Sequence, residues 1–110
     1  MNNSLSQAEF YILLSLAMKE RHGYEIMKQV EQDSQGRVSL GPGTLYGAIK
    51  RMLQSQLIEE IAGDHPRRKY YRLTGQGREA LSAELERYRD VLALAKQSGL
   101  FPRLGLLESV

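Results

Sequence analysis

Residues 42–54 read PGTLYGAIKRMLQ, and this stretch decides the fold. Proline is tolerated in the first turn of a helix, where its missing N–H costs no hydrogen bond. Apolar residues then recur at the i, i+4, i+7, i+8 spacing of one helix face, at Leu45, Ile49, Met52 and Leu53. The pattern predicts a helix that begins at Pro42, ends near Gln56 and packs by that face.

The opposite face of this predicted helix combines small and cationic residues. It carries Gly43, Gly47, Lys50, Arg51 and Gln54, flanked by Thr44 and Tyr46. A helix that enters the major groove of DNA needs small residues for close approach and long donors that reach phosphates or base edges. Glycine inside a helix costs roughly 0.8–1.0 kcal/mol relative to alanine, so Gly47 indicates close contact with another surface. A plain solvated face is the alternative.

A hairpin with a basic tip follows this helix. Residues 57–62 and 69–73 are short and rich in β-branched and aromatic residues, and the polar linker GDHPRR joins them with turn chemistry. The tip gathers His65, Arg67, Arg68 and Lys69. A charged tip that only keeps the hairpin soluble is the alternative. Beside a cationic helix, however, such a tip provides a second grip on a duplex backbone.

Two more helices are predicted upstream. Ser6 and Glu9 have the spacing of a capping box, so the first helix starts at Ser6. It is apolar nearly all round from Phe10 to Met18, which predicts that it is the hub of the core. The second helix starts near His22 and stops by Gly36, and the alternation in residues 38–40 predicts one short strand.

A long helix is predicted at the carboxy-terminal end, capped by Thr74 and extending to about Ser98. Its apolar residues alternate in steps of four and three, as in a paired helix: Leu81, Leu85, Tyr88, Leu92 and Ala95. At 1.5 Å per residue it reaches about 36 Å, too far for one small domain to cover. We expect a second protomer to cover this apolar row, with packing on the first helix as the alternative for part of it.

The predicted order is helix, helix, short strand, helix, hairpin and long helix, which is that of a winged helix-turn-helix. The fold class is mainly α with a small β component (α+β). We expect residues 1–74 to form the winged domain, and residues 75–110 to add a dimerisation helix and tail within one compact unit. Residues 100–107 are apolar for a tail, which predicts packing across a dimer or into an interface cavity.

Composition excludes several classes of protein. The 110 residues include no cysteine, which excludes a disulfide scaffold, a thiolate metal site and a cysteine nucleophile. The two histidines lack a metal-binding spacing, and no phosphate-binding glycine loop or paired carboxylates stand out, so we expect no metal, no cofactor and no catalysis. The longest apolar stretch falls short of the ~20 residues of a membrane span. Without a signal-like start, the expected location is the cytoplasm, away from membranes.

Several segments, in order from residue 5 to about residue 90, resemble the PadR family of transcriptional regulators and its short members. They are Leu5-Ser6 with Glu9-Phe10 and Ile12-Leu13, His22-Gly23-Tyr24-Glu25-Ile26, Gly43-Thr44-Leu45-Tyr46 with Lys50-Arg51, Leu57-Ile58, and Tyr70-Tyr71-Arg72-Leu73-Thr74 with Gly77. The resemblance implies a homodimer that reads a palindromic site on double-stranded DNA, usually as a repressor. It makes Thr44, Tyr46, Lys50 and Arg51 the recognition candidates and Tyr24 a neighbour of a phosphate. A core-filling ring is the alternative for Tyr24.

The resemblance also implies a small aromatic or drug-like effector between the first and last helices, where Tyr11, Ser15, Tyr88 and Leu92 would line the pocket. The chain has no tryptophan, which excludes the tryptophan-lined slot of multidrug-binding members. Closed packing is the alternative for this seam. For the whole protein, the alternative function is a winged helix used for protein–protein contacts without sequence-specific DNA binding.

Overall fold

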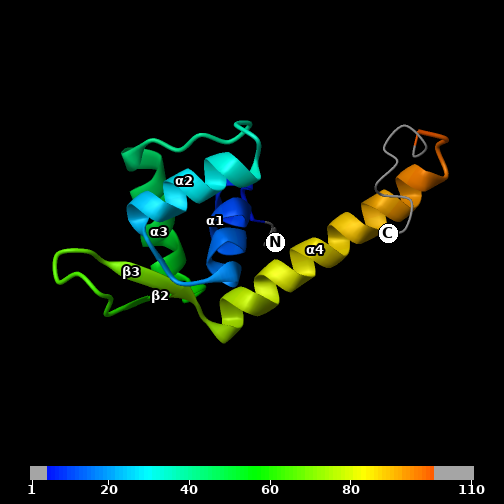
Figure 1. Cartoon of the computed structure of the whole chain (residues 1–110). Coiled ribbons are helices and arrows are strands. Elements are labelled where there is room, and N and C mark those ends of the chain that lie inside the picture. Colours follow the sequence, from blue (N-terminus) through cyan, green and yellow to red (C-terminus); the bar gives the residue numbers. More distant parts are fainter. Residues whose placement is uncertain (1–4, 101–110) are drawn as a thin grey trace.

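The computed structural model describes residues 5–100. The helices are α1 (Gln7–Met18), α2 (Gly23–Asp33), α3 (Pro42–Gln54) and α4 (Gly75–Lys96), and the strands are β1 (Arg21–His22), β2 (Ile58–Ile61) and β3 (Tyr70–Leu73). Helices α1 to α3 form a bundle, the β2–β3 hairpin projects from one side, and α4 leaves from the other (Figure 1). The predicted winged helix-turn-helix with a long carboxy-terminal helix is therefore confirmed.

The helices begin where their caps predict. The Ser6 hydroxyl accepts a hydrogen bond from the Glu9 N–H at 3.1 Å, and the Glu9 carboxylate accepts one from the Ser6 N–H at 2.9 Å. Pro42 opens α3, and the Thr74 hydroxyl accepts a bond from the Gly77 N–H at 2.9 Å. Each such cap satisfies an amide that would otherwise lack an acceptor, which is worth ~1 kcal/mol.

The predicted strand at residues 38–40 is wrong. The third strand is β1, which pairs antiparallel with β3 and places Arg21 opposite Tyr71, in the sheet order β1-β3-β2. Val38 is buried, and its N–H donates to the Ser34 hydroxyl at 2.9 Å rather than to a strand. The alternation at 38–40 therefore reflects a loop that packs one side chain into the core.

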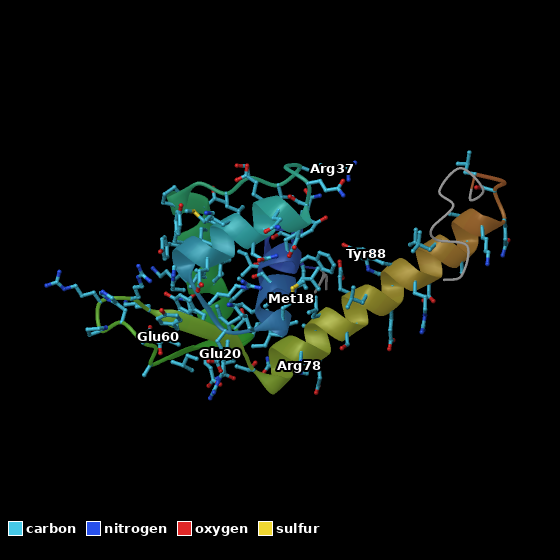
Figure 2. The ribbon with its side chains drawn as sticks, in the orientation of Figure 1. Met18, Glu20, Arg37, Glu60, Arg78 and Tyr88 are labelled. Atoms are coloured by element: carbon cyan, nitrogen blue, oxygen red, sulfur yellow. The ribbon has the colours of Figure 1, made fainter. Side chains whose placement is uncertain are left out.

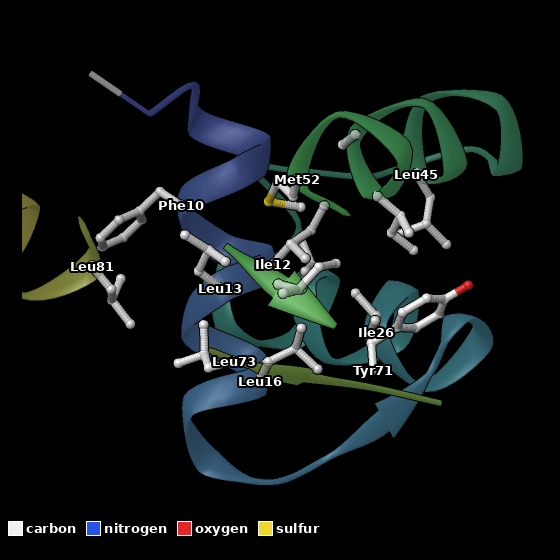
Figure 3. Packing of buried hydrophobic residues seen from close by; sticks show 14 of the residues in the cluster. Phe10, Ile12, Leu13, Leu16, Ile26, Leu45, Met52, Tyr71, Leu73 and Leu81 are labelled. Atoms are coloured by element: carbon white, nitrogen blue, oxygen red, sulfur yellow. The ribbon is translucent and has the colours of Figure 1, made fainter. Parts of the chain in front are cut away.

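The core forms around α1, as predicted. Side chains from every helix and from β3 meet on it (Figure 3). The most deeply buried are Ile12, Leu13, Ile26, Leu45 and Met52. Beside them the buried Arg21 donates from Nε to the Ser15 carbonyl at 2.9 Å, which ties β1 to α1. This core fixes the positions of α2, α3 and the hairpin relative to one another.

The first turns of α4 complete the core, and the rest of the helix extends away from it (Figure 1). Gly77, Leu81 and Glu84 are buried. Leu81 was expected at a dimer interface, but it packs in the core of its own protomer because α1 and β3 lie against this part of α4. The apolar row that was predicted to face a second protomer therefore starts at Leu85 rather than at Leu81.

Two further predictions concern membrane spans and the apolar tail. Between residues 5 and 100, no helix combines the length and the apolarity needed to cross a bilayer. The apolar tail was expected to pack in a dimer, but its residues 101–110 lie outside the described residues, as do residues 1–4.

Candidate nucleic-acid interface

Several elements surround an open hollow of about 390 Å³ on one side of the domain. Its lining comes from the β1–α2 junction, from α3 and β3, and from the wing, which is the loop of residues 62–69 between β2 and β3. The lining residues are His22, Gly23, Tyr24, Tyr46, Arg67, Arg68, Lys69 and Tyr71. Among the residues that the structure describes, the lining thus combines three cations with four aromatic rings and includes no carboxylate.

The amino-terminal end of α2 forms one wall of this hollow. Helix amino termini carry a partial positive charge and unpaired N–H groups, which favour anions. Tyr24, in the first turn of α2, is 59% exposed, and the Lys28 ammonium lies 5.4 Å from the centre of its ring. The alternative in which Tyr24 fills the core is therefore wrong.

His22 is the N-cap of α2 and connects it to the wing. Its Nδ1 accepts a hydrogen bond from the Glu25 N–H at 3.4 Å, so it acts as the cap in place of the usual serine or aspartate. Its ring meets that of Tyr70 edge to face, with centroids 5.4 Å apart. The Arg68 Nη1 lies 3.5 Å from the His22 Nε2, so a side chain of the wing contacts the N-cap of α2 directly.

The wing presents its cations in a turn that His65 stabilises. The His65 Nδ1 accepts from the Arg67 N–H at 3.2 Å, and its carbonyl accepts from the Arg68 N–H at 3.1 Å. Arg67, Arg68 and Lys69 are exposed and line the hollow. His65 is exposed and does not line the hollow, but it lines a neighbouring depression with Glu60 and the same three cations.

Tyr46 is the α3 residue that borders the hollow. Thr44, Tyr46, Lys50 and Arg51 are all exposed on α3, as expected for a recognition helix. Arg51 follows Tyr46 by five positions, which places it on a different flank of the helix. Its Nε lies 3.6 Å from the Glu9 carboxylate of α1. The structure therefore brings Tyr24 and Tyr46 together with Arg67, Arg68 and Lys69, and it places Arg51 beside α1.

Tyr71 forms the floor of the hollow, and the sequence analysis did not select it. Burial, followed by the negative charge of Glu60 and the neighbouring Tyr46, raises the pKa of its phenol above the usual 10.0. The neighbouring Arg72 belongs to the same basic segment but pairs with Glu59 at 2.7 Å, away from the hollow. The sequence placed His22 and Gly23 at the start of the second helix, where His22 was expected to cap or pack, but no local pattern indicated that the wing lies beside them.

The expected effector pocket is only partly assembled. Phe10 brings Tyr11 and Tyr88 together, with ring centroids 5.5 and 5.0 Å from its own. Ser15 is wrongly placed in that set, since it is fully buried and its hydroxyl donates to the Ile12 carbonyl at 2.7 Å. Leu92 is half-buried further along α4. Burial, followed by Glu84, raises the pKa of the Tyr88 phenol.

The exposed row on α4 is wider than the sequence analysis proposed. Leu85 and Tyr88 are exposed as expected, and Leu92 and Ala95 are half-buried. Val91 and Leu94 are also exposed and were not predicted. The side chains of α4 beyond Tyr88 have no other described element beside them (Figure 2).

Comparisons with known proteins identify the family to which this chain belongs. Residues 12–83 match the family model of the transcriptional regulator PadR-like family. Protein X of Lysinibacillus sphaericus is 31% identical over 83 residues, which cover 73% of this chain and 76% of that protein. Transcriptional regulator YqjI of Escherichia coli (strain K12) is 33% identical over 75 residues, which cover 68% of this chain and 36% of that protein.

A solved structure resembles the whole described fold. The crystal structure of a PadR family transcription regulator from Clostridium difficile R20291 has a TM-score of 0.71 and 31% sequence identity, and the match covers 84% of this chain and 97% of that one. The family model itself spans more than half of the sequence. This chain belongs to the PadR-like family of transcriptional regulators.

Proposed function

We propose that the protein is a transcriptional repressor that binds a palindromic promoter site as a homodimer, by seating one phosphate backbone in the hollow while the outer face of α3 enters the major groove. The proposed activity is binding rather than catalysis. The observation that supports it most is the position of Arg67, Arg68 and Lys69 across the hollow from the amino terminus of α2. Cations and free helix amides are the two groups that protein surfaces use to bind phosphates.

The tyrosines extend this argument. Tyr24 and Tyr46 both line the hollow and are 59% and 51% exposed, so both side chains are accessible to a phosphate backbone seated there. Gly43 is exposed and has open space around it, which allows the backbone of α3 to approach the groove closely. Together these features supply donors for phosphates beside a helix face that can read bases.

The homodimer is supported by the exposed apolar side chains of α4. Leu85 and Tyr88 lie on neighbouring faces of α4, 60° apart around the helix axis at 100° per residue, and both would leave water if a second α4 packed against them. A two-fold pair of winged domains reads two half-sites, with recognition helices ~34 Å apart, one turn of DNA. Repression then follows when the occupied site overlaps a promoter.

An aromatic effector is a further part of the proposal. The edge-to-face cluster of Tyr11, Phe10 and Tyr88 joins α1 to α4 at the base of the proposed dimer. A flat aromatic molecule inserted there would compete with these ring contacts. It would change the angle between α4 and the winged domain and release DNA. Adding aromatic acids to the preformed DNA complex tests this step, and unchanged binding at every concentration would remove the effector from the proposal.

Salt dependence of duplex binding tests the main proposal. Fluorescence anisotropy with a labelled 30-base-pair duplex should give a linear fall of log K with log salt, with a slope of about −0.9 for each phosphate neutralised. The double variant Arg67→Ala/Arg68→Ala should bind at least tenfold more weakly at low salt, and its slope should be shallower by about 1.8 for two lost phosphate contacts. A winged helix used only for protein contacts would show no such response.

The matched control removes the same charge elsewhere. Arg78 and Arg89 are exposed on α4, outside the hollow, so Arg78→Ala/Arg89→Ala has the same net charge as the wing variant. We expect near wild-type affinity for the control. Equal weakening by the two double variants would mean that only overall charge matters, and it would contradict the assigned surface.

A further inference from the structure

Glu9 in α1 forms an ion pair with Arg51 in α3, with 3.6 Å between Oε2 and Nε. The two residues are far apart in the sequence, and the contact joins the first turn of the hub helix to the last turn of the recognition helix. The apolar core already packs α1 against α3, so the fold does not depend on this exposed pair. The pair instead affects how much positive charge α3 presents.

Glu9 is the fixed partner of this pair. Its Oε1 accepts from the Ser6 N–H at 2.9 Å, and its own N–H donates to the Ser6 hydroxyl at 3.1 Å. Its side chain is 19% exposed, whereas that of Arg51 is 61% exposed. Because the capping box holds the carboxylate in place, Arg51 is the partner that moves when the pair opens.

Arg51 lies at the edge of the surface proposed to contact DNA. A Cβ built at Gly47, one turn earlier, would lie 3.7 Å from the Arg51 Nη1. The guanidinium is therefore beside the outer face of α3, close to Gly47. From this position a small rotation of the Arg51 side chain would replace the Glu9 carboxylate with a DNA phosphate as its partner. Both groups accept hydrogen bonds from the same guanidinium N–H donors.

We propose that Glu9 masks Arg51, so that the free protein and its loosely bound DNA complexes leave this cation unused. Glu9 is a positioning residue in this account, and the inference rests on the proposed function. Loose binding to arbitrary sequences is almost wholly electrostatic, so each cation removed from it weakens it and shortens the stay on irrelevant DNA. A base contact strong enough to open the pair would still recruit Arg51.

The magnitude expected is that of one exposed ion pair. Such pairs change an equilibrium constant by up to about fivefold. Glu9→Gln keeps an oxygen that accepts the Ser6 N–H bond, so it preserves the cap while removing the charge. We expect this variant to bind a random-sequence duplex roughly threefold more tightly at low salt, with a salt slope steeper by about 0.9 because one more phosphate is neutralised.

The decisive comparison uses Arg51→Ala as the background. If Glu9 acts through Arg51, adding Glu9→Gln to Arg51→Ala should change neither affinity nor slope. An equal gain in both backgrounds would mean that Glu9 repels phosphate directly, which overturns the inference. Glu79→Gln removes one exposed negative charge from α4 and should leave binding unchanged. If it matches Glu9→Gln, net charge explains the gain and the inference also fails.

The outcomes separate this inference from the proposed function. A wild-type protein that shows no salt-dependent binding to duplex DNA contradicts the proposed function. A wild-type protein that binds as proposed, together with a Glu9→Gln variant identical to it, contradicts the masking of Arg51 alone. Circular dichroism of each variant before the titration confirms that the fold is intact.

Discussion

The phenol of Tyr46 in α3 occupies the space that a side chain at Gly23 would need at the start of α2. A Cβ at Gly23 would come within 2.9 Å of the Tyr46 Cζ and closer still to its hydroxyl oxygen. Both Gly23 and Tyr46 line the hollow, together with residues of the wing. Gly23 therefore allows Tyr46 to lie against the amino end of α2 and to line the candidate phosphate site.

Gly23→Ala tests the importance of this contact. The ring is half exposed and can rotate away, so we expect a loss in unfolding free energy of no more than ~1.5 kcal/mol. Duplex affinity should fall several-fold, because Tyr46 leaves the hollow. Gly75→Ala is the matched control, since Gly75 is also the first residue of a helix and has open space around it. Equal affinities of the two variants would contradict a role for the Tyr46 position.

Gly77 gives a purely structural prediction. A Cβ there would collide with the carbonyl group of Leu57, which is backbone and cannot rotate away as a side chain can. That carbonyl also accepts a hydrogen bond from the Thr74 N–H at 3.1 Å. We expect Gly77→Ala to lower the free energy of urea unfolding by about 3 kcal/mol. Gly75→Ala should leave it unchanged or raise it by ~0.5–1 kcal/mol. Similar urea midpoints for Gly77→Ala and Gly75→Ala would show that the first turn of α4 does not pack against the Leu57 carbonyl.

The best-predicted parts of the fold are those with strong local signals. The helix at residues 42–54 follows from its apolar spacing and its proline, and the hairpin follows from two β-rich segments around a turn. β1 could not be predicted, because two polar residues become a strand only when β3 lies beside them. The loop at residues 38–40 was wrongly predicted as a strand because apolar and polar residues alternate there. The same alternation arises in a loop that buries one side chain.

The sequence identified part of the candidate site, without Tyr71 and without the contacts between its elements. The exposed cations of α3 and the wing were found from composition and spacing, whereas the pairing of Arg51 with Glu9 links helices with no local pattern between them. His22 was expected to cap or pack at the start of α2, but its contact with Arg68 was not predicted, because the two residues are 46 positions apart in the sequence and no local pattern links them. The heptad pattern of α4 likewise does not distinguish Leu81, covered by its own protomer, from the exposed Leu85.

The proposed dimer predicts opposite results at these two leucines. Leu85 is 43% exposed in the single chain, so Leu85→Asp should leave the protomer folded. A charge buried between the two α4 helices is not tolerated, so this variant should be a monomer with half the mass of the wild-type dimer. Leu81→Asp should instead unfold the chain, since Leu81 is buried. Light scattering and circular dichroism measure both effects. Ala83→Asp places the same charge on a different face of α4 and should remain dimeric; if Leu85→Asp does so too, the proposed interface is wrong.

Tyr71 predicts how stability depends on alkaline pH. Burial raises the pKa of its phenol in the folded state, so the unfolded chain loses this proton first as the pH rises past ~10. Its contribution is fully present below that value and is lost as the pH rises towards the folded pKa. The free energy of urea unfolding of Tyr71→Phe should therefore decline less steeply with pH than that of the wild type above pH 9.5. Below pH 9 the two curves of unfolding free energy against pH should run parallel. Parallel curves throughout would contradict the buried phenol.

The central claim is that the hollow and the outer face of α3 together form the surface that contacts DNA. Adding a short duplex at low salt to the isotopically labelled protein and following backbone amide resonances tests it most directly. The account predicts the largest shifts at Gly23, Tyr24, Thr44, Arg67 and Arg68, and little change at Glu59 and Gln76, which lie at a different depression. Shifts centred on Glu59 and Gln76, or none at the wing, would contradict it.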